Sequence, residues 1–177
     1  MRRLLWGFLM LCLCAGAALA DEPVEQPAPL LGVGYKLGNG IGFYGGDVVV
    51  DPLPHLSIDL YGSYVSEDAG YNNGAKATGF ALAPAIQGYL FAGRRSTPYL
   101  AVGMQYVSLS LGSSSASGTG FFANIGYEWK FRFGLGIQLG AGIQHLSRVD
   151  ASDGVSTVSL GGQTKPNIEL GIRYMFL

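Results

Sequence analysis

The sequence predicts an all-β fold, an eight-stranded antiparallel up-and-down transmembrane β-barrel, on three observations. Segments of about ten residues alternate apolar and polar side chains along the whole chain, with no convincing helix between them. The last such segment, Asn167–Phe176, reads NIELGIRYMF and puts Ile, Leu, Ile, Tyr and Phe on one face and Asn, Glu, Gly, Arg and Met on the other. Finally, residues 1–20 have the features of a secretory signal peptide.

The N-terminal segment supports export of the chain. Its features are, in order, the basic residues Arg2 and Arg3, the apolar run Leu4–Cys14, and the small residues Ala18 and Ala20. We expect cleavage between Ala20 and Asp21, because the apolar run is short of the roughly 20 residues that a membrane anchor needs. Both cysteines, Cys12 and Cys14, lie in this segment, so the mature chain would hold no disulfide and no thiolate.

The mature chain is expected to be one domain. Residues 21–29 are polar and contain proline, which indicates a periplasmic N-terminal tail, and residues 30–177 would form the barrel. Without Arg2 and Arg3, nine Lys and Arg face twelve Asp and Glu, a formal net charge of −3, so no basic surface suggests nucleic acid as a partner. The 28 glycines are spread through the strand-like segments, where small inward residues would relieve crowding in a narrow barrel.

Eight strands can be assigned from the alternation. They are expected at Leu30–Leu37, Ile41–Val50, Leu56–Val65, Ala77–Phe91, Pro98–Leu111, Thr119–Phe131, Phe133–Leu146 and Asn167–Phe176. In the first, every second residue from Leu31 is apolar and the intervening residues are Gly, Gly and Lys. Asn39-Gly40 is the strongest hairpin signal and precedes the second strand. The turn 51–54, with two prolines, is expected to end that strand before the regular alternation of the third.

The later strands differ in regularity. After the fourth strand and a charged turn near Arg94, the apolar face of the fifth strand changes phase between Met104 and Val107, which predicts a β-bulge near Tyr106. The sixth strand is the clearest, with an apolar or aromatic residue at every second position from Phe121. In the seventh, Leu and Ile alternate with Gly and Gln, which again indicates one apolar face and one small or polar face.

Connections of alternating length predict the topology. Short turns at Pro52, Arg94 and Arg132 alternate with polar stretches at 66–76, 112–118 and 147–165, which are expected to be loops. Outer-membrane barrels keep short turns in the periplasm and long loops outside, so both termini would be periplasmic. Residues 155–160 could form a ninth strand, but an odd count would move the C-terminus outside. We therefore expect them to extend the last hairpin on the extracellular side.

These features resemble the small outer-membrane β-barrel families of the opacity-protein, OmpX and OmpW type. The resemblance rests on the signal peptide, the eight alternating segments and the ending Gly171–Phe176, and it covers essentially the whole mature chain. It implies the outer membrane of a Gram-negative bacterium and an assembly signal at Tyr174 and Phe176 that the barrel-insertion machinery reads. Leu177, which follows the terminal aromatic, departs from the family pattern.

The inward faces carry the polar residues of interest. The predicted lumen network comprises Lys36, Asp47, Asp59, Asn124, Glu128, Lys130, Glu169 and Arg173. An eight-stranded barrel leaves an interior that side chains just fill, and buried charges must be paired. Because three cations face four carboxylates, the sequence predicts a nearly balanced polar plug, with a narrow ion path or proton relay as the alternative.

One constellation suggests an enzyme. His145 and Ser147 resemble the His-x-Ser pair on the outer face of lipid A deacylases, in which the histidine activates a serine nucleophile. The pattern departs from that family at Gly142, where an arginine is expected, and at Arg148, where an asparagine is expected. No metal-ligand spacing and no phosphate-binding loop occurs in the sequence, so no cofactor is expected.

The sequence therefore favours a non-enzymatic outer-membrane barrel with a structural role, or a role in surface interaction through its extracellular loops. The alternative is an OmpW-like carrier or narrow channel for small apolar molecules, and a lipid A deacylase-like hydrolase is a minor one. Expected partners are outer-membrane lipid and lipopolysaccharide, the barrel-insertion machinery and an extracellular ligand. An apolar upper lumen would favour carriage, whereas a salt-bridged plug would favour a structural role.

Overall fold

The computed structural model describes residues 30–38, 44–68, 76–91, 96–152 and 157–176. The expected signal peptide with Ala18, Ala20 and Asp21, the N-terminal tail, the Asn39-Gly40 turn and the turn at Arg94 lie outside these residues. Within the described residues, no helix is both long enough and apolar enough to cross a membrane.

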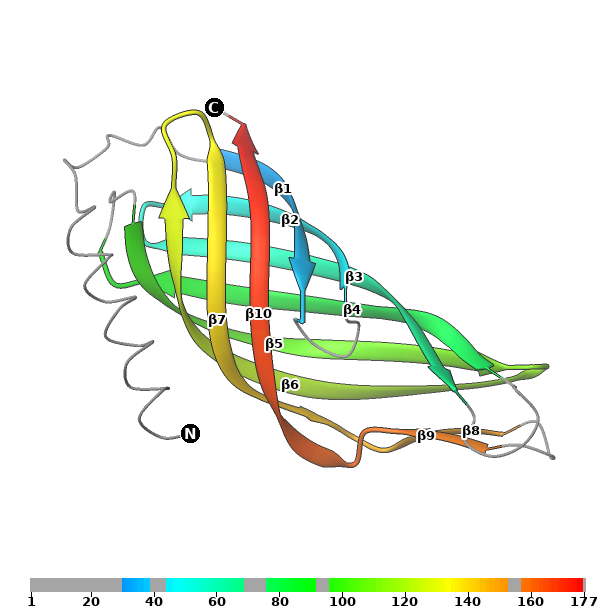
Figure 1. Cartoon of the computed structure of the whole chain (residues 1–177). Helices are drawn as coiled ribbons and strands as arrows, with labels where there is room; N and C mark the ends of the chain where they lie inside the picture. The colour runs from blue at the N-terminus through cyan, green and yellow to red at the C-terminus, as the bar shows by residue number, and fades with distance from the viewer. Residues whose placement is uncertain (1–29, 39–43, 69–75, 92–95, 153–156, 177) are drawn as a thin grey trace.

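Eight antiparallel strands close into one barrel, which confirms the predicted fold class (Figure 1). Its strands are β1 (Leu30–Leu37), β2 (Tyr44–Leu53), β3 (Leu56–Asp68), β4 (Lys76–Tyr89), β5 (Ser96–Leu111), β6 (Ser114–Lys130), β7 (Leu135–Leu146) and β10 (Gln163–Phe176). Consecutive barrel strands are neighbours in the sheet, and pairing of β1 with β10 closes the barrel. Closure gives every strand two partners, so no backbone edge faces hydrocarbon.

The two ends of the barrel differ. At one end, here called the short-turn end, lie the start of β1, the end of β10 and the β2–β3, β4–β5 and β6–β7 connections. At the other, the projecting end, β3 to β6 extend past their neighbours, as the long green strands of Figure 1 show. Pairing of β6 with β7 begins only at Gly120, so Ser114–Thr119 belong to this extension.

The segment between β7 and β10 forms a hairpin of its own. Strands β8 (Val149–Ser152) and β9 (Thr157–Leu160) pair with each other in a separate two-stranded sheet at the projecting end. The prediction that residues 155–160 extend the last hairpin, and are not a ninth barrel strand, is confirmed for the described residues 157–160.

Several strands are longer than the sequence predicts. The polar stretch 112–118, predicted to be a loop, is a two-residue turn at Gly112 and Ser113 followed by β6 from Ser114. Likewise β3 and β4 continue into the predicted 66–76 loop, and β10 starts at Gln163, well before Asn167. The difference arises because hydrophobic alternation marks only the part of a strand that faces hydrocarbon, whereas backbone pairing continues beyond it.

The predicted β-bulge in the fifth strand is wrong. Strand β5 keeps one register against β6 along its whole length, and its inward and outward positions alternate without a slip. Leu100, Val102 and Met104 face outward, whereas Val107 and the two leucines that follow on the same face are buried. What changes near Tyr106 is the polarity of the interior and not the geometry of the strand.

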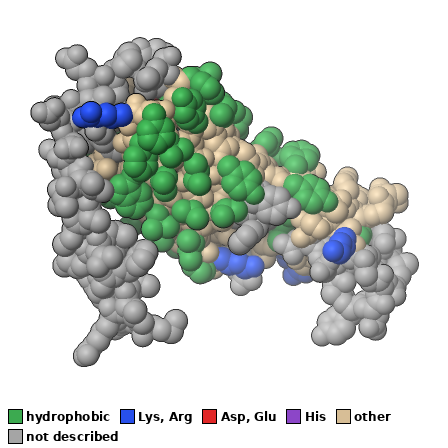
Figure 2. Space-filling model, turned by 45° about the horizontal axis from the view of Figure 1, so that its top comes forward, with side chains coloured by type: hydrophobic (Ala, Val, Ile, Leu, Met, Phe, Trp, Pro, Cys, Tyr) green, Lys and Arg blue, Asp and Glu red, His purple; other side chains and the backbone are tan. Residues whose placement is uncertain are grey.

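Hydrophobic side chains cover the outer wall of the barrel (Figure 2), and exposed aromatic side chains lie at the short-turn end. On β6, Phe121 and Ile125 are outward and exposed, as predicted. Exposed ring pairs stand at the short-turn end, namely Phe131 with Phe133 and Tyr174 with Phe176. Aromatic side chains at the end of an apolar wall are typical of the membrane–water interface.

Interior glycines make room for large inward side chains. The Tyr99 ring lies against Gly126 and Gly140, where an added Cβ would overlap the phenol. Phe122 occupies the corresponding space beside Gly103. Because an eight-stranded barrel is narrow, each large interior residue needs a small one beside it on a neighbouring strand.

Candidate functional site

The centre of the lumen is built around Arg173 of β10, which is 2% exposed. Its guanidinium donates to Gln138 Oε1 at 2.6 Å and to Asp59 Oδ2 at 3.2 Å, and reaches Asp47 Oδ2 at 3.5 Å. A second nitrogen lies 3.8 Å from Glu128 Oε1. One side chain thus links β2, β3, β6 and β7 to β10, because the planar guanidinium presents several donors at once.

Lys36 of β1 lies among the same carboxylates. Its ammonium forms a close ion pair with Asp59 and lies 3.3 Å from Glu169 Oε1 and 3.7 Å from Asp47 Oδ2. Toward the projecting end, Glu169 Oε2 accepts from Asn124 at 2.9 Å, and Asn124 Oδ1 accepts from Asn167 at 3.1 Å. Burial of these charges is tolerable because each has several polar partners.

A second ion pair lies nearer the short-turn end. Lys130 Nζ donates to Asp51 Oδ2 at 3.1 Å and lies 4.3 Å from the centre of the Tyr89 ring. The Ser57 hydroxyl donates to Asp51 and lies 3.0 Å from the Tyr89 hydroxyl. The sequence predicts Asp51 in a turn, but β2 runs on to Leu53 and Asp51 is 4% exposed.

These residues form the polar plug, defined as Lys36, Asp47, Asp51, Asp59, Asn124, Glu128, Lys130, Gln138, Glu169 and Arg173. All eight residues of the predicted lumen network lie in it, on the inner faces of five strands. The charge balance is less even than the sequence predicts, because Asp51 makes five carboxylates against three cations in the plug.

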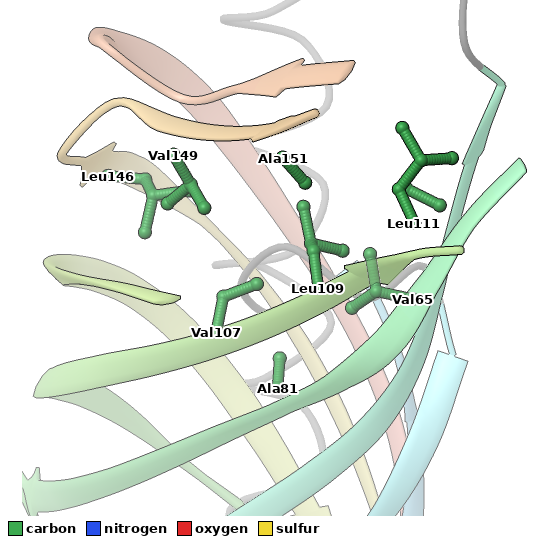
Figure 3. Packing of buried hydrophobic residues seen from close by; sticks show 9 residues of the cluster. Val65, Ala81, Val107, Leu109, Leu111, Leu146, Val149 and Ala151 are labelled. Atoms are coloured by element: carbon green, nitrogen blue, oxygen red, sulfur yellow. The ribbon is translucent and has the colours of Figure 1, made fainter. Parts of the chain in front are cut away.

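Beyond the plug, the projecting end has an apolar interior (Figure 3). The apolar cluster comprises Val65, Ala77, Ala81, Val107, Leu109, Leu111, Leu146, Val149 and Ala151. Val149 and Ala151 come from β8, which lies across the inner face of β5. The β8–β9 hairpin therefore excludes water from the apolar inner face of the projecting strands. Burial of these side chains stabilises the packing of the hairpin against the barrel.

The polar side of this hairpin is held by an exposed group of side chains. Arg148 Nε donates to both Asp150 oxygens at 2.9 Å, and the Ser159 hydroxyl also donates to Asp150. The hydrogen bond from Ser159, followed by that from Arg148, holds the pKa of Asp150 below its usual value. The Asp150 carboxylate therefore stays ionised at neutral pH. Its contacts with Arg148 and Ser159 hold β8 and β9 together in addition to their backbone pairing.

The structure gives His145 and Ser147 different partners. His145 lies outward, 3.2 Å from the Thr164 hydroxyl and stacked on Phe121 with ring centres 5.3 Å apart. The Ser147 hydroxyl donates to the Thr119 carbonyl at 2.6 Å and accepts from the Thr119 amide at 3.2 Å. Because its proton is directed to a backbone carbonyl, Ser147 is held as a cap on β6 and not as a nucleophile activated by histidine.

The last two outward residues of β10 lie at the seam of the barrel. Tyr174 and Phe176 are 47% and 48% exposed, with ring centres 5.5 Å apart. Tyr174 pairs with Val33 of β1, and Phe176 pairs with Leu31. The two aromatic rings therefore face outward where the first and last strands meet.

A closed antiparallel barrel with an apolar wall and a paired, charged interior defines an integral membrane β-barrel. The chain belongs to the outer membrane protein β-barrel domain family, whose model matches residues 7–176. Its fold is also similar to that of a major outer membrane protein from Thermus thermophilus. That similarity has a TM-score of 0.50 and 15% identity over 85% of this chain and 100% of the other, and it shows the fold alone. No curated protein matched the sequence.

Proposed function

We propose that this outer-membrane barrel is a non-enzymatic protein with a closed lumen, whose role is structural or depends on surface contacts made by its projecting end. The polar plug supports the proposal most strongly. Arg173 and Lys36 alone connect side chains from six of the eight barrel strands across the lumen. A solute would have to break these buried ion pairs to pass.

In this proposal the short-turn end faces the periplasm, with both ends of the barrel chain, and the projecting end faces outward. The extension of β3 to β6 and the β8–β9 hairpin would then stand beyond the lipopolysaccharide and present polar side chains to an extracellular ligand. Lipopolysaccharide and outer-membrane lipid would contact the wall, and nucleic acid would not be a partner.

The closed lumen predicts a lack of conductance. Purified barrel incorporated into planar lipid bilayers is expected to give no stable unitary current, because an ion would have to displace charged groups that are already paired with one another. Incorporation is checked separately by recovery of the protein from the bilayer lipid. Reproducible unitary steps from the incorporated protein would contradict the closed-lumen proposal.

A second candidate function is the carriage of a small apolar molecule. The apolar cluster favours it, because Val107, Leu109 and Leu146 form an interior of the kind that a hydrocarbon ligand would contact. The β8–β9 hairpin would have to move for a ligand to enter, and the plug would still separate it from the short-turn end. Saturable binding of an apolar fluorescent probe, abolished when a disulfide ties the hairpin to β5, would favour carriage over the structural role.

The resemblance to small barrels predicts a role in assembly for the end of β10. Phe176→Ala should lower the amount of folded barrel recovered from outer membranes severalfold, because it removes the terminal ring that the insertion machinery is proposed to read. Phe133→Ala is the matched control, since Phe133 is also an exposed aromatic at the short-turn end but lies in a turn. Deletion of Leu177 should leave the yield unchanged or improve it. A large loss on deleting Leu177, with Phe176→Ala tolerated, would show that the signal lies elsewhere.

A further inference from the structure

The seam between β1 and β10 joins the two ends of the barrel chain, and within the described residues its first strand is the shortest of the eight. Strand β1 has 8 residues, whereas the other barrel strands have 10 to 17. Among the residues of β1 whose side chains the structure describes, the inward positions are Gly32, Gly34 and Lys36. Two of these three contribute no side chain to the interior, so this part of β1 has little packing of its own to hold it in place.

Side chains from the two neighbours of β1 meet over its glycines. Gly34 pairs with Arg173 of β10 on one side and with Asp47 of β2 on the other, and these two form an ion pair at 3.5 Å. In the next inward row, Gly32 lies between Met175 of β10 and Val49 of β2, which pack together as a buried cluster. In both rows, β10 touches β2 across the intervening strand.

The third row has the reverse arrangement. Lys36 of β1 lies between Gly171 of β10 and Gly45 of β2, so its neighbours carry no side chain where β1 carries a long one. Its ammonium reaches carboxylates on β2, β3 and β10. In each of the three rows, large residues thus lie beside small ones: the glycine is on β1 in the first two rows and on both of its neighbours in the third.

We propose that these residues form a seam latch, which holds β1 between β10 and β2 and keeps the finished barrel closed. The latch comprises Gly32, Gly34 and Lys36 of β1, Asp47 and Val49 of β2, and Arg173 and Met175 of β10. The Arg173–Asp47 and Met175–Val49 contacts join the last strand to the second across the first, so they form only when the barrel closes. The latch is independent of the role proposed for the projecting end.

Space at Gly34 is essential to this arrangement. A Cβ there would overlap Asp47 Oδ1 and lie 2.9 Å from Arg173 Cβ, so Gly34→Ala would obstruct the ion pair without removing a charge. At Gly46 of β2, which pairs with Tyr35, an added Cβ would meet only a backbone oxygen at 3.7 Å. Gly46→Ala is therefore the matched control for Gly34→Ala.

The test is hydrogen exchange of the mature chain refolded in lipid vesicles. Gly34→Ala and Asp47→Asn should each speed exchange of β1 and β10 amides about ten-fold or more, as the loss of a buried charge-assisted hydrogen bond implies, with β4 and β5 changed less than about two-fold. Gly46→Ala should leave the seam unchanged. Asp51→Asn also removes a buried ion pair of β2, but this pair joins β2 to Lys130 of β6 and not to β10, so exchange of β1 and β10 should not be accelerated preferentially.

A cross-link separates the latch from a general loss of stability. Val33 and Tyr174 pair across the seam, and paired positions on antiparallel strands lie within disulfide range. A disulfide between Val33→Cys and Tyr174→Cys should return β1 and β10 exchange in Asp47→Asn to the wild-type rate, or restore folding if Asp47→Asn alone fails to fold. Uniform acceleration over all strands, or no rescue by the disulfide, would overturn the proposal.

Discussion

Ile125→Arg is expected to destabilise the barrel by roughly 2–4 kcal/mol, the cost of an arginine on the lipid face near the bilayer midplane. Ile125 lies outward on β6 and is 63% exposed, and its partner on β5, Leu100, is outward and 54% exposed. Both lie between the aromatic short-turn end and the projecting end, where hydrocarbon must cover the wall. The measurement is the free energy of unfolding in urea for each variant refolded into lipid vesicles.

Thr119→Arg is the matched control for this result. Thr119 is on the same strand and also exposed, but it lies beyond Phe121 on the projecting side, where the wall becomes polar. Because the cost of an outward arginine falls toward zero near the interface, Thr119→Arg should change the free energy of unfolding by about 0–1 kcal/mol. Equal stability of the Ile125→Arg barrel and the wild type would mean that this face does not contact hydrocarbon.

Most of the barrel could be predicted because a membrane wall enforces a two-residue period. Each strand has lipid on one side and the lumen on the other, so Ile125 and Asn124 must differ in polarity. The polar plug follows from the same rule, since a charged residue such as Glu128 or Arg173 between two outward apolar residues can only face inward. What the period cannot give is the partner of each charge, because this depends on the register across the lumen.

The misplaced elements lie where that rule ceases to apply. On the projecting side of the plug, Val107 and Leu109 face inward and yet are apolar, because the β8–β9 hairpin covers them. An apolar residue there no longer marks the outer face. Gly118, part of a predicted loop, is in β6, where the Val149 side chain takes the space of a Cβ. Asp51 looks like a turn residue beside proline, yet its carboxylate reaches Lys130 across the lumen. These are long-range contacts, and a local pattern carries no signal for them.

Arg173→Met should cost about 3–5 kcal/mol of unfolding free energy, because removing one cation from a buried ion-pair network leaves an excess of buried negative charge. Asp47, Asp59 and Glu128 would all lose the guanidinium, which lies 3.2 to 3.8 Å from their carboxylate oxygens. Methionine keeps much of the side-chain volume, so the loss reports the charge and not a cavity. Urea unfolding in lipid vesicles measures it on the same scale as the Ile125 series.

Two comparisons identify the buried charge as the cause. Arg148→Met removes an arginine that pairs with Asp150 at 2.9 Å, but the Arg148 side chain is 67% exposed, so its loss should have little effect on stability. After Arg173→Met, Lys36 and Lys130 alone face the five carboxylates of the plug, and the excess negative charge would be relieved by binding protons in the folded state. The folded variant then binds more protons than the unfolded chain, so its deficit relative to wild type should shrink as the pH falls from about 8 to about 5. A deficit as small as that of Arg148→Met would mean that Arg173 does not hold the plug together, and a deficit independent of pH would mean that packing, and not charge, is what the arginine supplies.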